Sequence, residues 1–233
     1  MRLQVFMAKS GVASRRACEQ IIAEGRVCVN GKIETTPGTK VSINDKILVD
    51  GKEISLEEEN VYVLLNKPSG YVCSANDEKG RDVALDLLKP HFSQRLYNVG
   101  RLDMYSCGLI IFTNDGEFAA KISHPSSQLQ KEYLVEATTP IPQELIDKFQ
   151  KGIRIDNVFY KCQNITKKNS KTVNIVLIEG KNREIRRVFE FFDLGIKRLI
   201  RVRIGNIQMN GLPEGKFRQL SSEEVQSLLK KDY

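Results

Sequence analysis

The stretch NVGRLDMYSCGLIIFTNDGE, residues 98–117, joins a charged segment to an apolar run. The run at 108–112 has the length of a buried strand, and the Asn-Asp-Gly at 114–116 is a turn signal that ends it. Arg101 and Asp103 stand just ahead of this strand. An aspartate in that position is commonly a turn or N-cap residue. The alternative, a functional carboxylate with a basic partner, depends on the rest of the chain.

The sequence around this stretch predicts a larger α+β domain that begins at residue 61. Its strands and helices are unevenly spaced, which favours a mixed, largely antiparallel sheet over a doubly wound one. Pro142 and Gly152 bracket one helix, and Ser221 with Glu224 forms a capping box for the last helix. The expected strands fall at 61–67, 108–112, 132–137, 171–177 and 198–209, and the expected helices at 117–123, 142–151, 182–192 and 221–231.

Residues 1–56 predict a smaller unit that contains two short helices and a β-hairpin. Gly11 ends the first helix, and Ser14 is a good N-cap for the second. The Asn-Gly pair at 30–31 is a strong hairpin signal. Strand-like segments follow at 40–43 and 46–54, and the acidic residues 57–60 are interpreted as a linker to the domain at 61–233.

The second short helix carries two adjacent arginines. Ala17, Ile21 and Ile22 are assigned to its apolar stripe, which leaves Arg15 and Arg16 pointing outward. The 233-residue chain has a net charge of +7 and an isoelectric point near 9.1. This excess of positive charge favours a polyanionic partner such as nucleic acid.

Residue usage excludes several classes of protein and site. Five cysteines without C-x-x-C spacing, with only two histidines, do not predict a zinc site, and scattered free cysteines suit a reducing cytosol. Neither a signal peptide nor an apolar run long enough for a membrane helix is expected. Asp103 has no second carboxylate placed for glycoside hydrolysis, and no Walker or dinucleotide loop is present. Ser–His–Asp chemistry stays open, although neither His91 nor His124 lies in a nucleophile elbow.

Residues 181–203 form the most basic segment, with eight Lys or Arg side chains against three acidic ones. In the helix expected at 182–192, Ile185 and Val188 mark the buried face, and Arg186 is adjacent to it. One interpretation is a solvated helix with intrahelical Arg–Glu pairs. The other is a phosphate-binding surface in which one arginine turns toward a carboxylate in a cleft.

Four motifs occur in one order along the chain. They are RLQVFMAKSGVASRRACEQIIAEGRVCVNGKI (2–33), VGRLDMYSCGLIIFTNDGEFAAKISHPS (99–126), KEYLV (131–135) and LIEGKNREIRRVFE (177–190), with RLIRVRIG (198–205) after the last. With these motifs the chain closely resembles, nearly end to end, bacterial ribosomal RNA pseudouridine synthases of the RsuA family, especially its RluB-type large-subunit branch. The first motif is similar to an S4 RNA-binding domain, and the others are similar to catalytic-domain elements of the pseudouridine synthase fold.

The resemblance implies an activity and roles for individual residues. It implies that a specific uridine of large-subunit (23S) ribosomal RNA is flipped out and isomerised to pseudouridine, without a cofactor or metal. Asp103 is the implied nucleophile, Tyr133 the active-site tyrosine, and Arg186 the candidate partner of the aspartate. The implied substrate contacts are Arg101, Leu177, Lys131, Lys181, Arg183, Arg187, Arg15 and Arg16.

The expected partner is structured ribosomal RNA or an assembling ribosomal subunit, and the expected protein is a cytoplasmic monomer that binds no membrane. Two other functions compete with this one. A non-catalytic RNA-binding or ribosome-assembly protein is disfavoured by intact Arg101, Asp103, Tyr133 and Arg186. A DNA-binding regulator with a helix-turn-helix at 3–25 is disfavoured by the hairpin that directly follows and by the large second domain. The sequence leaves open which uridine is modified and whether Asp103 attacks the sugar or the base.

Overall fold

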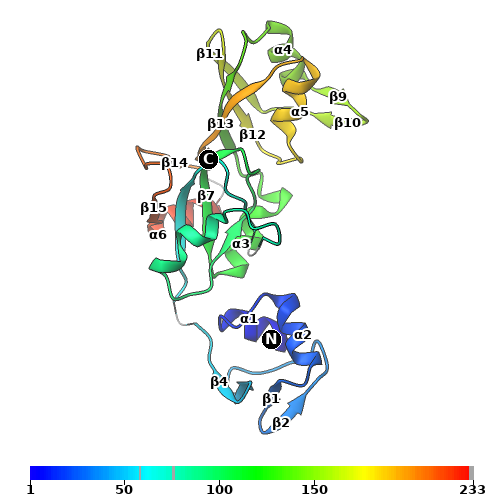
Figure 1. Cartoon of the computed structure of the whole chain (residues 1–233), viewed down its shortest axis with the longest axis vertical. Coiled ribbons are helices and arrows are strands. Elements are labelled where there is room, and N and C mark those ends of the chain that lie inside the picture. Colours follow the sequence, from blue (N-terminus) through cyan, green and yellow to red (C-terminus); the bar gives the residue numbers. More distant parts are fainter. Residues whose placement is uncertain (58, 75–76, 231–233) are drawn as a thin grey trace. The chain divides into compact units, whose positions relative to one another are not determined.

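The computed structural model describes residues 1–57, 59–74 and 77–230, which form two compact units (Figure 1). The first unit contains Met1–Val61 with short contributions from Phe92–Leu96 and Thr113–Gly116, and the second contains the remaining described residues. The expected boundaries, 1–56, 57–60 and 61–233, stay a prediction. Glu58 of the expected linker and residues 231–233 lie outside the described part of the chain.

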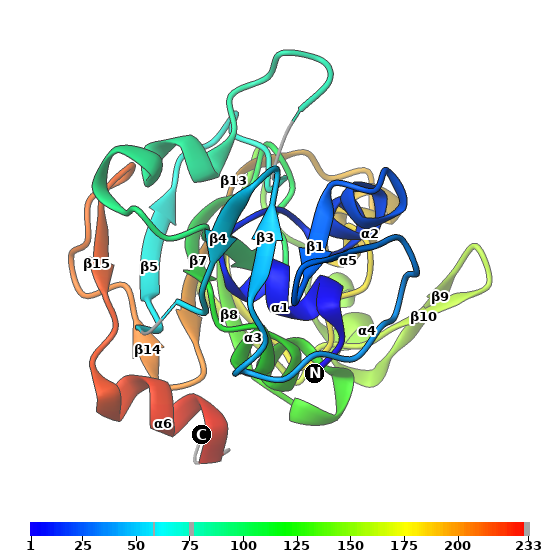
Figure 2. The ribbon, with the colours of Figure 1, turned by 90° about the horizontal axis from the view of Figure 1, so that it is seen from below.

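The first unit consists of two helices and a four-stranded sheet (Figure 2). The strand order is β2-β1-β3-β4, with β1 antiparallel to both of its neighbours. The elements are α1 (Leu3–Lys9), α2 (Arg15–Ala23), β1 (Val27–Val29), β2 (Lys32–Glu34), β3 (Ile47–Val49) and β4 (Lys52–Ile54).

The expected signals for these elements are confirmed. The Ser14 hydroxyl accepts a hydrogen bond from Ala17 N at 3.2 Å and caps α2. Gly11, at φ +76°, follows α1 in the left-handed region that ends many helices. Asn30 and Gly31 both have positive φ, 49° and 82°, as the tight turn between β1 and β2 requires.

Two details of this unit differ from the prediction. Ala17 is exposed, whereas Cys18 and Ile22 are fully buried, because residues four apart lie on one face of a helix. Of the residues assigned to the stripe, Ile22 is buried and Ile21 packs against the core, and Ala17 alone lies outside it. The strand expected at 40–43 does not form, and only an isolated bridge between Lys40 and Arg2 occurs there.

The second unit is built on a nine-stranded sheet. Along the main path the order is β11-β12-β8-β13-β7-β5-β15, with β14 paired to β13 and β6 paired to β7. Strands β7 and β13 pair in parallel, whereas β8 is antiparallel to β12 and β13, which confirms a mixed, largely antiparallel sheet. The strands are β5 (Tyr62–Lys67), β6 (Tyr97–Val99), β7 (Cys107–Thr113), β8 (Lys131–Ala137), β11 (Asn164–Asn169), β12 (Thr172–Leu177), β13 (Ile196–Ile204), β14 (Ile207–Gln208) and β15 (Phe217–Gln219).

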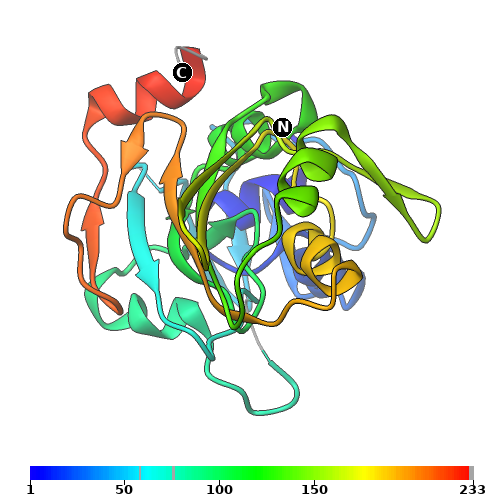
Figure 3. The same cartoon turned by 90° about the horizontal axis from the view of Figure 1, so that it is seen from above.

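Helices and a separate hairpin complete this unit. Helices α4 and α5 lie side by side, next to the hairpin of β9 and β10 (Figure 3). The predicted capping box is confirmed, because Ser221 N donates to Glu224 Oε2 at 2.9 Å and Glu224 N donates to Ser221 Oγ at 3.2 Å. The elements are α3 (Gly116–Ser123), α4 (Gln143–Lys151), α5 (Glu184–Phe191), α6 (Ser222–Lys230), β9 (Ile153–Ile155), β10 (Val158–Tyr160), and the short 3₁₀ helices η1 (Ala84–Leu87), η2 (Lys89–His91) and η3 (Pro125–Ser127). Within the described residues, no helix has the length and apolarity needed to cross a membrane.

Strand β7 is buried along its whole length and fixes the position of the loop before it. Its parallel ladder with β13 has two residue pairs, Ile200 with Cys107 and Arg201 with Gly108. A Cβ on Gly108 would lie 2.3 Å from Arg201 O, so glycine allows this close approach. Beyond the ladder, Arg201 Nε donates to Leu109 O at 2.6 Å, and a buried side chain thereby satisfies a strand carbonyl.

Candidate active site

A pocket of about 400 Å³ in the second unit is lined by seven of the residues that the sequence assigned to the site. Its walls come from the loop between β6 and β7, the middle of β8, the end of β12, and α5 with the loop that precedes it. The seven residues are Arg101, Asp103, Tyr133, Leu177, Lys181, Arg183 and Arg186.

The loop that carries Asp103 is held by backbone and buried side-chain contacts. Ser106 N donates to Asp103 O at 3.0 Å and closes a turn over the aspartate. Gly70 N donates to Met104 O at 2.8 Å, which ties the loop to the turn after β5. The Asp103 side chain is 33% exposed, so it is reachable from solvent while its backbone is fixed.

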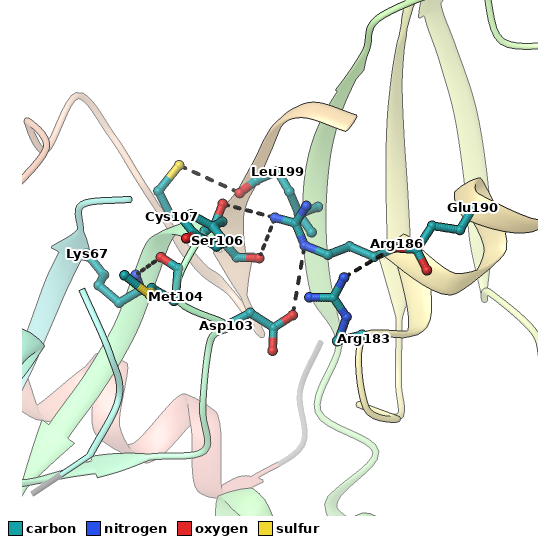
Figure 4. Close-up of polar contacts among 10 residues, drawn as sticks. Lys67, Asp103, Met104, Ser106, Cys107, Arg183, Arg186, Glu190 and Leu199 are labelled. Carbon is teal, nitrogen blue, oxygen red and sulfur yellow. Dashed lines mark hydrogen bonds and ion pairs between the residues drawn. The ribbon is translucent and has the colours of Figure 1, made fainter. Parts of the chain in front are cut away.

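Arg186 reaches the same loop from α5 (Figure 4). Its Nη2 donates to Tyr105 O at 2.9 Å and to Ser106 Oγ at 3.2 Å, and its Nε lies 3.9 Å from Asp103 Oδ2. The last distance is that of an ion pair without a direct hydrogen bond. Arg186 therefore places a positive charge beside the carboxylate and leaves the carboxylate oxygens free to react.

Burial sets the electrostatics of Arg186. Burial and the nearby Arg183 lower the pKa of the Arg186 guanidinium, and the charge of Asp103 opposes this shift. A guanidinium remains charged at physiological pH even when its pKa falls. The side chain of Arg186 is 13% exposed, so its attraction to Asp103 is less screened than that of a surface pair.

Tyr133 and Leu177 supply the apolar surface of the pocket. Tyr133 pairs with Ile175 of β12, and Leu177 lies two residues farther along β12, so Tyr133 and Leu177 share one face of the sheet. Both are buried, with exposed fractions of 9% and 4%. A flat aromatic ring beside an aliphatic floor suits stacking of a planar base.

Lys67 is a buried residue near the site that the sequence analysis missed. It is fully buried at the end of β5, and its ammonium donates to the carbonyls of Pro68, Tyr71 and Met104 at 2.7, 2.9 and 3.3 Å. Burial lowers the pKa of this ammonium. The signal in the sequence is a lysine that ends the otherwise apolar strand VYVLLNK, directly before proline.

Of the other residues predicted to contact the substrate, some line the pocket and some lie outside it. Arg183 pairs with Glu190 at 3.1 Å, which matches the interpretation of α5 as a solvated helix at that position. Lys181 pairs with Glu179 at 2.7 Å at the rim of the pocket. Arg187 is half-buried on α5 and does not line this pocket. Lys131 lines a neighbouring cavity. Arg15 and Arg16 are exposed on α2 of the first unit.

The pocket offers the Asp103 carboxylate with the Arg186 guanidinium beside it, the buried carboxyl group of Glu184, and the apolar surface of Tyr133 and Leu177. A carboxylate aimed in this way can act as a nucleophile. Across the described residues, no group of three or more His, Cys, Asp or Glu side chains is placed to hold a metal ion.

Comparison with known proteins accounts for this geometry. Residues 61–191 match the RNA pseudouridylate synthase family, and residues 1–47 match the S4 domain. The chain belongs to the RNA pseudouridylate synthase family. It is an enzyme of the class that isomerises uridine to pseudouridine in RNA, joined to an S4 RNA-binding domain.

Relatives match almost the whole chain. An uncharacterized RNA pseudouridine synthase of Borreliella burgdorferi is 39% identical, with 97% of this chain and 92% of the relative covered. A ribosomal large subunit pseudouridine synthase B of Bacillus subtilis is 40% identical, with 97% and 95% covered. A crystal structure of a pseudouridylate synthase superposes with a TM-score of 0.71 at 26% identity, covering 98% of this chain and 99% of that one.

Proposed function

We propose that this pseudouridine synthase modifies one uridine of large-subunit (23S) ribosomal RNA, with Asp103 as the nucleophile. The observation that carries the proposal is the pocket in which Asp103 lies beside the Arg186 charge and next to the Tyr133 ring. The substrate class follows the name of the Bacillus subtilis relative, which is similar over nearly its full length.

The reaction is an isomerisation, so its atoms balance without a second reactant. The target uridine leaves the stack and enters the pocket, and Asp103 forms a transient covalent bond to it. The bond between C1′ and N1 breaks, the uracil rotates, C1′ bonds to C5, and the bond to Asp103 breaks, which regenerates the carboxylate. The proton on C5 then leaves and N1 gains one, so no oxidant, reductant or water is consumed.

The neighbouring side chains support these steps. Arg186 stabilises the ionised carboxylate of Asp103, and Leu177 forms the floor below the uracil. Tyr133 packs on the uracil ring, with its hydroxyl toward C5. Arg101, which is exposed at the rim, enters the RNA beside the flipped base.

The remaining basic residues supply affinity for RNA. Lys131, Lys181, Arg183 and Arg187 contact phosphates around the site, and Arg15 with Arg16 contacts phosphates from the S4 domain. In this proposal the protein acts as a cytoplasmic monomer on free ribosomal RNA or on an assembling subunit.

A pseudouridine map of ribosomal RNA from cells with and without this gene tests the proposal. The expected result is the loss of one large-subunit site, restored by the wild-type gene and not by a gene that encodes Asp103→Asn. Loss of a small-subunit or transfer-RNA site instead contradicts the proposed substrate. An unchanged map, with RNA binding intact, favours a non-catalytic role in ribosome assembly.

A further inference from the structure

A second cavity, of about 500 Å³, adjoins the candidate active site. The two cavities share four lining residues, Arg101, Tyr133, Gly180 and Lys181. Neither of the reacting partners, Asp103 and Arg186, lines the second cavity. It is therefore a separate compartment next to the place where the uridine reacts.

Arg201 brings a buried positive charge to this cavity. The residue lines the cavity and is only 4% exposed. Its Nε donates to Leu109 O, and within the described residues its two terminal nitrogens make no hydrogen bond and are not fully buried. An anion that enters the cavity can therefore accept hydrogen bonds from these nitrogens.

Lys131 adds a second cation on the same face of the sheet. It lies two residues from Tyr133 along β8, and Tyr133 is paired across the sheet with Arg201. The Lys131 ammonium donates to Ile178 O at 3.3 Å. Burial and the nearby Arg201 lower the pKa of Lys131 to about 8, so the two cations repel each other in the absence of an anion.

The carboxylate on the cavity wall does not neutralise this pair of cations. Glu179 lines the cavity, but its carboxylate pairs with Lys181 at 2.7 Å and is exposed. The aliphatic wall of the cavity is formed by Ile111, Ile122, Leu129 and Ile204, and Ile204 pairs with Lys131 across the sheet. A cavity that combines an anion site with aliphatic side chains fits a nucleotide, which has a phosphate and a flat apolar-faced base.

We propose that this cavity binds a second nucleotide of the RNA, the chain neighbour of the isomerised uridine. Its phosphate lies against Lys131 and Arg201, and its base lies against the aliphatic wall. The proposal rests on the proposed function, because adjacent cavities that share a wall suit adjacent nucleotides of one RNA strand. The cavity would then be a subsite that determines specificity, because its shape selects the base of the neighbouring nucleotide.

The test uses stem-loop RNA that carries the target uridine, with one change at a time in its neighbours. A neutral methylphosphonate replaces each flanking phosphate, and an abasic residue replaces each flanking base. Binding of each RNA is measured for wild type, Lys131→Met, Lys131→Arg and the control Lys167→Met. Lys167 is a matched control because its Nζ also donates to a single backbone carbonyl, Ile141 O at 3.1 Å, and the residue lines neither cavity.

We expect one methylphosphonate to weaken wild-type binding about tenfold, the size of a lost charge-assisted hydrogen bond. The abasic change on the same side weakens it as well. Lys131→Met weakens binding of unmodified RNA about tenfold, and this variant binds the methylphosphonate RNA as well as it binds unmodified RNA. Lys131→Arg restores the sensitivity of binding to the methylphosphonate. Lys167→Met binds both RNAs as wild type does. Thermal unfolding of each variant reports that the fold is kept.

The outcomes separate this proposal from the proposed function. The loss of RNA affinity caused by Lys131→Met and the loss caused by the neutral linkage multiply if the two changes act independently. That result, with pseudouridine still formed by wild type, means that the second nucleotide does not occupy this cavity. Sensitivity to the neutral linkage without sensitivity to the abasic residue contradicts a nucleotide and indicates a phosphate contact alone. Absence of pseudouridine formation by wild type contradicts the proposed function. It then also contradicts the proposal that the two cavities bind adjacent nucleotides.

Discussion

Arg186 Nε lies 3.9 Å from Asp103 Oδ2, while Arg186 Nη2 donates to Tyr105 O at 2.9 Å. The arginine is thus positioned by the loop that carries the aspartate, and its charge faces the aspartate without a direct hydrogen bond. Such an arrangement places a positive charge beside the carboxylate and leaves its lone pairs available. The first two predictions follow from this geometry.

Asp103→Asn is expected to abolish turnover without weakening RNA binding. Asparagine has nearly the same size, but it has no charge and does not form the covalent bond to substrate. Removal of a negative charge also relieves repulsion of phosphates, so affinity stays the same or rises slightly. Pseudouridine formation in a large-subunit transcript, with a binding curve at fixed salt, measures both effects. Asp147→Asn, on the exposed face of α4, is the control, and appreciable turnover by Asp103→Asn contradicts the assigned nucleophile.

Arg186→Met is expected to lower kcat at least a hundredfold and to change KM little. The substitution removes the charge beside Asp103 and the two hydrogen bonds to the loop, but it keeps the apolar stem. The comparison is Arg187→Met, one residue along α5 and outside the pocket, which is expected to raise KM and leave kcat nearly unchanged. Equal effects of the two variants on kcat would show that Asp103 depends on general positive charge rather than on Arg186.

Lys67→Met is expected to lower the free energy of unfolding by about 2 kcal/mol, because buried carbonyls lose their donor. One of those carbonyls belongs to Met104, next to Asp103, so kcat should fall as well. Urea unfolding and turnover are measured beside Lys121→Met, which alters an exposed lysine of α3. An unfolding free energy equal to that of wild type is the result that contradicts this structural role.

RNA affinity is expected to fall as pH rises through about 8. The pKa of Lys131 is lowered to about 8, so the ammonium is charged below that pH and loses its proton above it. Phosphate binds the protonated form, which makes affinity highest on the acid side of this range. Binding curves from pH 7 to pH 9 at constant salt measure the change.

Lys131→Met is the control for this pH dependence and should remove it. The charged groups that surround Lys131 are Arg201 on β13, Glu184 on α5, and Arg101, Lys181, Glu179 and His124 on the cavity wall. A pH profile that survives in Lys131→Met assigns the effect to one of these groups or to the RNA.

The double variant Arg15→Gln, Arg16→Gln is expected to weaken RNA binding and to reduce its salt dependence. Both side chains are exposed on α2, and each phosphate contact that is lost lowers the slope of log K against log salt by about 0.9. KM rises while kcat changes little, because the change lies in the S4 domain. The charge-matched pair Lys148→Gln, Lys151→Gln on α4 is the comparison, and equal slopes for the two proteins contradict this role of the arginines.

Local signals allowed much of the fold to be predicted from sequence. The Ser14 cap, the Asn30–Gly31 turn and the Ser221–Glu224 box each depend on residues close in the chain, and all three form. The strand expected at 40–43 failed, since a short polar segment forms a strand only if a partner strand is available.

The parts of the site that sequence analysis missed depend on long-range packing. Arg201 was counted only as one of the basic residues of 181–203, yet it is buried and its Nε donates to Leu109 O. Lys67 was taken as part of a strand and a turn, and its three carbonyl partners come from separate turns brought together in space. The seven assigned residues that do line the pocket were found through a resemblance that already contains such spatial information.

The short parallel pairing of β7 with β13 has a consequence for the order in which the enzyme is made. The bond from Arg201 to Leu109 spans 92 positions in the chain, and the bond from Arg186 to Tyr105 spans 81. Contacts between such distant segments are slow to form, because a long loop must close first. During translation, Asp103 leaves the ribosome well before α5 and β13 are synthesised. A nascent chain therefore carries Asp103 without a binding pocket around it, and it gains activity only when the last third of the protein has been made and has docked.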